Sequence, residues 1–190
     1  GTMLASNSKI EEVITSASDF VESNMVIGDE TVRIPIQLPQ GDIRNEINLK
    51  GHPYLQGKEI LIKGKLESYC GSMGVKSPSA YQITYTIPIN IYGYATLFLD
   101  MPVAVPEGCT AYYCTTDGNT ANLLPVNTII PAEIGVVITY TLGAKCSFTY
   151  TTVANNKDDF EKNQLIGYTQ DTDITDSDNT YYALNVKDGQ

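Results

Sequence analysis

The sequence predicts an all-β protein in which an OB-like small barrel with one short helix packs against a β-sandwich. In residues 59–63, Ile60 and Ile62 fall on one face of a strand while charged residues flank Leu61 on the other. Gly64 interrupts that strand, as at a bulge that lets a small sheet curl toward a barrel. After Tyr85 the chain divides into short apolar runs separated by glycine and proline, a pattern typical of sandwiches.

The first half shows an order of strands and one helix. Met25–Ile27 and Val32–Leu38 predict a hairpin around a Gly-Asp turn. Gly41–Gln56 has loosely spaced apolar residues and predicts a helix that closes one end of the sheet. If a further strand lies within residues 1–20, the order matches an OB-fold, whose helix lies between its third and fourth strands. Ser8–Glu11 has the spacing of a capping box and predicts a short helical turn.

The strand at residues 59–69 leads into a loop and a further strand. Gly71 and Gly74 are expected to turn that loop, and Ser77-Pro78 to end it before Tyr81.

The second half is predicted to be β throughout. The expected domains are residues 1–87 and 88–190, and the short link near Thr86–Asn90 predicts that they pack together. The strands expected after the link are Tyr94–Leu99, Val103–Val105, Thr110–Cys114, Leu123–Val126, Val136–Leu142, Ser147–Val153 and Tyr181–Val186.

Charge is distributed unevenly along the chain. The 190 residues have a formal net charge of −10. Residues 1–87 contain eight Lys or Arg and ten Asp or Glu, whereas residues 88–190 contain four and twelve. No Arg follows Arg44. Nucleic acid is therefore not expected as a partner, because such binding depends on many Lys and Arg contacts to phosphates.

The first residues do not indicate where the protein is located. No apolar run approaches the roughly 20 residues that span a bilayer, and no signal-peptide pattern is present. Gly1 is interpreted as a residue left by tag cleavage, so an export signal is not expected within this sequence.

The four cysteines predict neither zinc nor redox chemistry. Their spacing matches no C-x2-C motif, and His52 is the only imidazole. Free buried thiols are the preferred interpretation, and a Cys114–Cys146 disulfide is the alternative. Cys109 and Cys114 are expected on opposite faces of one strand, because they are five positions apart.

Several segments carry a family resemblance. Val32–Pro39, Leu55–Gly64 and Gly74–Pro78, with Asn48–Lys50 and Leu66–Tyr69, resemble an OB-like domain of unknown function found in secreted multidomain surface proteins of Gram-negative gut anaerobes. Residues 93–108, with Ile129–Ala132 and Asn163–Gly167, look like a β-rich C-terminal module of the same proteins.

The resemblance implies export, attachment to the outer cell surface and an accessory role in adhesion or glycan capture. It brings no catalytic residues. The leading strand of the OB-like domain is poorly represented, and one more strand is expected where the chain stops at Gln190. Membrane association is expected only through a lipid anchor outside this chain.

Two residues are candidate catalytic groups. His52 is the only candidate base for a hydrolase triad, but a solvated loop histidine is the preferred interpretation. Asp100 interrupts an apolar run, yet a turn at the end of a strand explains it more simply than catalysis. The protein is expected not to be an enzyme, with an unusual hydrolase as the least favoured alternative.

An acidic run raises the question of calcium. Asp171, Asp173, Asp176 and Asp178 offer carboxylate oxygens but lack the glycine and closing Glu of an EF-hand loop. A solvated loop is preferred over a calcium site, and no metal or cofactor is expected.

A ligand site is predicted by fold analogy alone. OB-folds bind their ligands across strands 2 and 3 and at the loop between strands 4 and 5, called L45. In this sequence these regions contain Arg33, Tyr69, Met73 and Lys76. Partners of this site would be a glycan or another surface protein. The preferred function is an adhesion, scaffold or accessory binding module, and the alternative is a carbohydrate-binding module of a glycan-degradation system.

Overall fold

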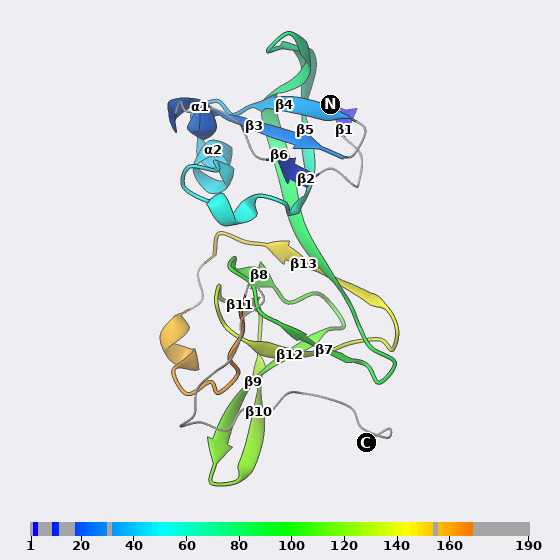
Figure 1. The fold of residues 1–190 in the computed structure, drawn as a ribbon, viewed down its shortest axis with the longest axis vertical. Helices are drawn as coiled ribbons and strands as arrows, with labels where there is room; N and C mark the ends of the chain where they lie inside the picture. Colours follow the sequence, from blue (N-terminus) through cyan, green and yellow to red (C-terminus); the bar gives the residue numbers. More distant parts are fainter. Residues whose placement is uncertain (1, 4–8, 12–17, 30–31, 154–155, 169–190) are drawn as a thin grey trace.

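The computed structural model describes residues 2–3, 9–11, 18–29, 32–153 and 156–168, and these are mostly β-strand (Figure 1). The all-β prediction is confirmed. The strand expected at Tyr181–Val186 and the acidic run Asp171–Asp178 lie outside the described residues.

Five strands close into a small barrel. Their ring order is β5, β2, β3, β4 and β6, and β6 pairs again with β5. All pairings are antiparallel except the one between β4 and β6, which is parallel at Ile36 and Val75. The strands are β2 (Lys9–Glu11), β3 (Asn24–Gly28), β4 (Arg33–Gln37), β5 (Glu59–Tyr69) and β6 (Ser72–Pro88).

The first strand of the barrel lies where a helical turn was expected. Lys9–Glu11 pairs with β3 and forms β2, so the strand sought within residues 1–20 is present and the capping-box prediction was wrong for these residues. Ile10 explains the difference: it is 1% exposed and lies opposite Ile27, so burial in the barrel outweighs the local spacing. A two-residue strand, β1 (Thr2–Met3), extends the sheet beside β5.

Short helices lie at one end of the barrel. Residues 41–56 contain α2 (Asp42–Ile47) and η1 (Pro53–Leu55), which confirms a helix between the third and fourth barrel strands. Ile47 and Leu55 are fully buried and close that end of the core. Before β3 lies α1 (Ser18–Ser23).

The hairpin of β5 and β6 is longer than expected. Its register shifts between Lys63 and Lys65, which confirms a bulge at Gly64. The turn is only Cys70-Gly71, with φ of 52° and 78° as in a type I′ turn. The loop expected from Gly71 to Pro78 is not present. Most of that segment is strand, since β6 begins at Ser72.

The second half contains a separate four-stranded sheet and an extension of the barrel sheet. The separate sheet has the order β10-β9-β12-β7, and β13, β8 and β11 continue from β6. The strand β11 was not expected. The bounds are β7 (Tyr94–Leu97), β8 (Val103–Ala104), β9 (Thr110–Asp117), β10 (Thr120–Val126), β11 (Ile129–Ile130), β12 (Val136–Thr139) and β13 (Lys145–Tyr150), followed by η2 (Lys157–Phe160).

One strand belongs to both halves of the molecule. Up to Thr84, β6 pairs with β5, and from Thr84 to Pro88 it pairs with β13 (Figure 1). Its side chains Ile83 and Ile87 are both buried, in a core cluster that also contains Phe148 of β13. The core therefore continues from the barrel into the second half.

Candidate functional site

Three of the four predicted ligand residues lie on the β5–β6 hairpin, which projects from the barrel, and two of them, Tyr69 and Lys76, are in contact (Figure 1). Lys76 Nζ lies 5.6 Å from the ring centroid of Tyr69, a cation–π contact across the two strands. The same ammonium lies 3.8 Å from Glu67 Oε2. Met73 is 62% exposed near the tip. Met73 stands opposite Ser68, so it lies on the other side of the hairpin from Tyr69, Glu67 and Lys76. We call the side with the Tyr69 ring and the Glu67–Lys76 ion pair the hairpin face.

Tyr69 is held in place by the barrel wall. Its hydroxyl donates a hydrogen bond to Asn24 Oδ1, and the Asn24 side chain is buried at the start of β3. Burial, together with the neighbouring Cys70, raises the pKa of the Tyr69 hydroxyl above its ordinary value. The hydroxyl therefore stays protonated at neutral pH and keeps the ring in one orientation.

Gly74 allows the close packing beneath this ring. A side chain at this position would place its Cβ 2.7 Å from Pro35 O and 2.8 Å from Tyr69 Cβ. The residue was expected in a turn, but it lies inside β6 without a positive φ. Its role is therefore steric: it lets β4 and Tyr69 approach the strand.

Arg33 lies on β4, which pairs in parallel with β6 of the hairpin at Ile36 and Val75. It begins β4, is exposed, and stands opposite Gly28 of β3. It therefore lies on a barrel strand, as expected.

His52, expected as a solvated loop histidine, is half-buried between α2 and η1 and uses both ring nitrogens in hydrogen bonds. Its Nε2 lies 2.8 Å from Asn45 O, which can only accept, so Nε2 carries the proton. Nδ1 then accepts from the Tyr54 hydroxyl at 2.7 Å. Both ring nitrogens are used to fix the segment between α2 and η1, so the imidazole has a structural role here.

A tyrosine cluster that the sequence did not reveal joins the two halves. The Tyr81 hydroxyl donates to Glu46 Oε2 at 2.9 Å, and the Tyr150 hydroxyl donates to Glu46 O at 3.1 Å. Burial is the main cause that raises the pKa of both hydroxyls; Glu46 adds to it for Tyr81, and Tyr54 for Tyr150. These contacts tie α2 to β6 and β13. Tyrosines at strand positions gave no signal that distinguished them from ordinary core residues.

Asp100 lies in a bend after β7 and has a cationic neighbour. Lys58 Nζ is 3.2 Å from its Oδ1 and 5.3 Å from the ring centroid of Tyr85. Within the described part of the chain, the buried Oδ1 accepts no hydrogen bond, so its contact with Lys58 is an ion pair only. The expected turn is present, and the ion pair accounts for the carboxylate.

All four cysteines are free thiols in the structure. This confirms the preferred interpretation, and the alternative Cys114–Cys146 disulfide is not formed. Cys146 instead interacts with Cys109, and burial together with this neighbour raises the pKa of the Cys109 thiol to about 12. Cys70 is exposed in the hairpin turn.

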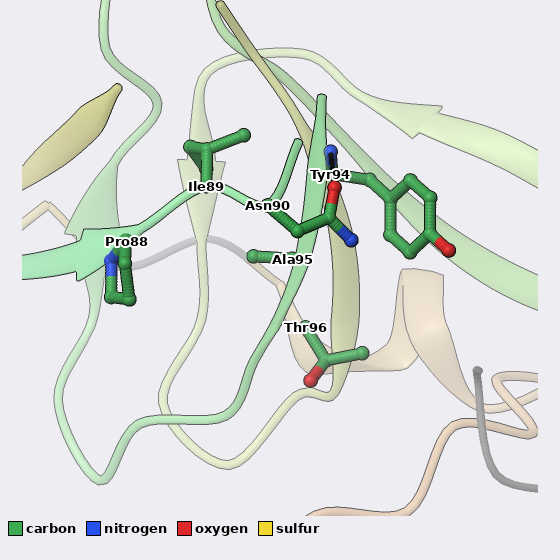
Figure 2. Close-up of a pocket in the computed structure, with 6 residues that line it drawn as sticks. All are labelled: Pro88, Ile89, Asn90, Tyr94, Ala95 and Thr96. Atoms are coloured by element: carbon green, nitrogen blue, oxygen red, sulfur yellow. Dashed lines mark hydrogen bonds between the residues drawn. The ribbon is translucent and has the colours of Figure 1, made fainter. Parts of the chain in front are cut away.

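Two shallow pockets lie in the second half. The first, of about 300 Å³, lies beside the β6–β7 connection; Figure 2 shows its lining by Pro88, Ile89, Asn90, Tyr94, Ala95 and Thr96. Asn90 Oδ1 accepts from the backbone N–H groups of Tyr92 and Tyr94, so this oxygen is committed to the turn. The second, of about 330 Å³, lies between β7 and residues 165–168. Neither includes the hairpin face.

The described residues contain no group of three or more His, Cys, Asp or Glu side chains that could hold a metal ion. Across the same part of the chain, no helix is long and apolar enough to cross a membrane.

Comparison with known proteins identifies the first part of the chain only. Residues 1–84 match the family model described as Domain of unknown function (DUF6359). Endonuclease YhcR of Bacillus subtilis (strain 168) is 35% identical over 51 residues, which is 27% of this chain and 4% of that protein. The match therefore spans a small fraction of that relative. No solved structure matches the chain.

Proposed function

We propose that the chain is a non-catalytic accessory binding module of a secreted or surface-attached protein, and that it binds through the hairpin face. The observation that carries this proposal is the contact of Lys76 with the Tyr69 ring on a projecting hairpin, beside the carboxylate of Glu67. Groups of this kind suit recognition, because an aromatic ring offers contact area while charged neighbours fix orientation.

The proposal includes an OB-like barrel followed by a β-sandwich. The ring order with a parallel pairing of β4 and β6, and with α2 between the third and fourth strands, supports the OB-like assignment. On that assignment the β5–β6 turn is the L45 loop, a region where OB-folds bind oligonucleotides and oligosaccharides. The two sheets of the second half support the sandwich.

The preferred partner is a glycan or another surface protein. Stacking of a sugar ring needs an exposed aromatic face, and Tyr69 has one edge anchored by Asn24 with Lys76 over its ring. A ligand would displace Lys76 from the ring or use its ammonium as a hydrogen-bond donor. Adhesion or scaffolding uses the same face with a protein partner.

Single-stranded nucleic acid is the competing ligand. The likeness to an endonuclease over 51 residues favours it, as does Lys65, which lies opposite Lys76 in the hairpin. The net charge of −10 opposes it, because phosphate binding gains most of its affinity from cationic side chains.

A binding experiment separates these ligands. The purified chain is applied to a glycan array and titrated with a single-stranded oligonucleotide at low salt. We expect glycan binding that Tyr69→Ala and Lys76→Ala each weaken by at least about tenfold, equivalent to about 1.4 kcal/mol. Tyr92→Ala, which removes an exposed tyrosine in the other half, is the matched control.

Unchanged glycan binding in both hairpin variants would overturn the proposed site. Oligonucleotide binding with no glycan binding would replace the ligand class. Turnover of a polysaccharide or peptide pool that survives repurification would contradict a non-catalytic role.

A further inference from the structure

Among the residues that the structure describes, the strand β10 forms a free edge of the four-stranded sheet. It pairs with β9 on one side and ends the sheet on the other. The β9–β10 hairpin projects from the body at the end opposite the barrel (Figure 1). Every residue of β10 except Val126 is exposed, so neither face of this strand is covered.

The backbone hydrogen bonds of β9 show which groups of β10 point outward. Cys114 N donates to Asn163 Oδ1 at 3.0 Å, and Gln164 N donates to Cys114 O at 2.7 Å. Both polar groups of Cys114 therefore face away from β10. Leu123 lies directly opposite Cys114, so its own N–H and C=O point to the free edge.

The residues two positions before and after Leu123 also point their backbone groups toward the free edge. Ala121 shares the outward orientation of Leu123, because the pattern repeats every second residue in an antiparallel pair. Pro125 falls in this phase as well, which explains how a proline fits here: its missing N–H would have faced outward. The edge thus offers the N–H of Ala121 and Leu123 and the C=O of all three residues.

This edge lacks the protection that exposed strands usually carry. Natural edge strands are blunted by charged side chains, bulges or covering segments. From Asn119 to Ala132 the sequence contains no charged residue, and Leu123 and Leu124 are 50% and 38% exposed. The Pro125 ring protects only the end of the strand.

We propose that β10 pairs antiparallel with β10 of a second copy of this chain. Charge favours this partner: a chain of net charge −10 repels its copies over most of its surface, and an uncharged strand is where two copies approach at the least electrostatic cost. The outward groups are self-complementary, as a two-fold interface requires.

The phase of the outward groups fixes the register. Ala121 lies opposite Leu123 of the other copy, and the reverse, which gives four backbone hydrogen bonds around a two-fold axis at Asn122. The Asn122 side chains of the two copies then face each other as a non-hydrogen-bonded pair. The two four-stranded sheets join into one continuous sheet.

Pairing with a second copy would also stabilise the projecting β9–β10 hairpin. A two-stranded ribbon is marginally stable alone, and three or more strands give it independent stability. Asp117, at the end of β9, and Thr120–Leu124 are exposed in the isolated chain. A second copy supplies a third and a fourth strand beside them.

Sedimentation velocity tests the association. We expect the full chain to form a dimer with rising concentration. Leu123→Pro removes one outward N–H without breaking a bond to β9, and we expect it to weaken dimerisation by at least tenfold. Leu123→Ala keeps the N–H and is the matched control, with a smaller effect. A monomer at every concentration, or a dimer equally stable in Leu123→Pro, would overturn the proposal.

Cross-linking tests the register. In a Cys70→Ser background, Asn122→Cys places two thiols on residues whose Cα atoms lie about 4.5 Å apart in this pairing, close enough for a disulfide. We expect copper–phenanthroline oxidation to give a covalent dimer on a non-reducing gel. Asn119→Cys lies three residues from the axis and should give none. Equal cross-linking of both variants, or none from Asn122→Cys, would contradict the register.

Discussion

Lys58 Nζ lies 3.2 Å from Asp100 Oδ1, so a residue just before β5 of the barrel is paired with a residue just after β7 of the second half. The Lys58 side chain is 16% exposed and the Asp100 side chain 36% exposed. This partial shielding from water makes the pair stronger than one on the open surface.

A double-mutant cycle measures this ion pair. Lys58→Ala and Asp100→Asn should each lower the free energy of unfolding by about 1–2 kcal/mol, with a coupling of about 1 kcal/mol, in urea denaturation. The matched control is Lys157 with Glu133, 2.9 Å apart, whose side chains are 52% and 67% exposed. Its coupling should be close to zero. Equal coupling in the two pairs would mean that burial does not strengthen the Lys58–Asp100 contact.

Alkaline pH should destabilise the protein through Tyr81 and Tyr150. The pKa of both hydroxyls is raised in the folded state by burial, with Glu46 or Tyr54 adding to it. Because the folded pKa exceeds the unfolded value near 10, this contribution to stability is complete below about pH 10 and is lost as the pH rises through the folded values. Thermal melts between pH 8 and 11.5 measure the loss. Tyr81→Phe should flatten the decline, and Tyr92→Phe should leave it unchanged.

Gly74→Ala should destabilise the barrel. The new methyl group would lie 2.7 Å from Pro35 O, and neither the backbone oxygen nor Tyr69 can move away freely. We expect a loss of about 1–3 kcal/mol in the free energy of unfolding, as for other overpacked positions. At Gly57, φ is +78° and no atom lies within 4 Å of the added Cβ. Gly57→Ala should cost about 1 kcal/mol from backbone strain alone. A smaller loss at Gly74 than at Gly57 would be the unexpected result.

Alkylation should distinguish the thiols. Cys70 is exposed in the hairpin turn, whereas the pKa of Cys109 is raised to about 12 and Cys114 and Cys146 are buried. Native protein treated with iodoacetamide at pH 8 should lose one thiol quickly, and peptide mass spectrometry should place the label on Cys70. Rapid labelling of Cys109 would show that it is accessible as a thiolate. Labelling in denaturant, where all four thiols should react, is the control.

The all-β fold class and most strands could be predicted from the sequence, because apolar and polar residues alternate strongly along the strands. Ile60 and Ile62, expected on a buried face, are 3% and 0% exposed. The prediction failed at residues 9–11 and 71–78, where tertiary pairing decides the structure. Ile10 joins a sheet with distant strands, and Gly74 and Pro78 are carried within β6. Local spacing and turn residues contain no information about such partners.

The candidate site was predicted in part for the same reason. Tyr69 and Lys76 are close in sequence and meet across one hairpin, whereas Met73 lies on the other side of that hairpin and Arg33 on another strand. The clusters that depend on contacts between halves were not predicted: Glu46 and Tyr150 are 104 residues apart, and Lys58 was not connected with Asp100. Only a folded chain brings such pairs together.

The match to the domain of unknown function ends at Thr84, which is also where β6 changes partners. Thr84 stands opposite Glu59 of β5 and opposite Thr149 of β13. The joint between the halves is therefore a hydrogen-bonded strand rather than a hinge loop. Rotation of one half relative to the other would require twisting β6 and breaking its hydrogen bonds to β5 or β13. A force applied at the hairpin tip, or a displacement caused by a ligand there, would therefore be transmitted along β6 to the second half.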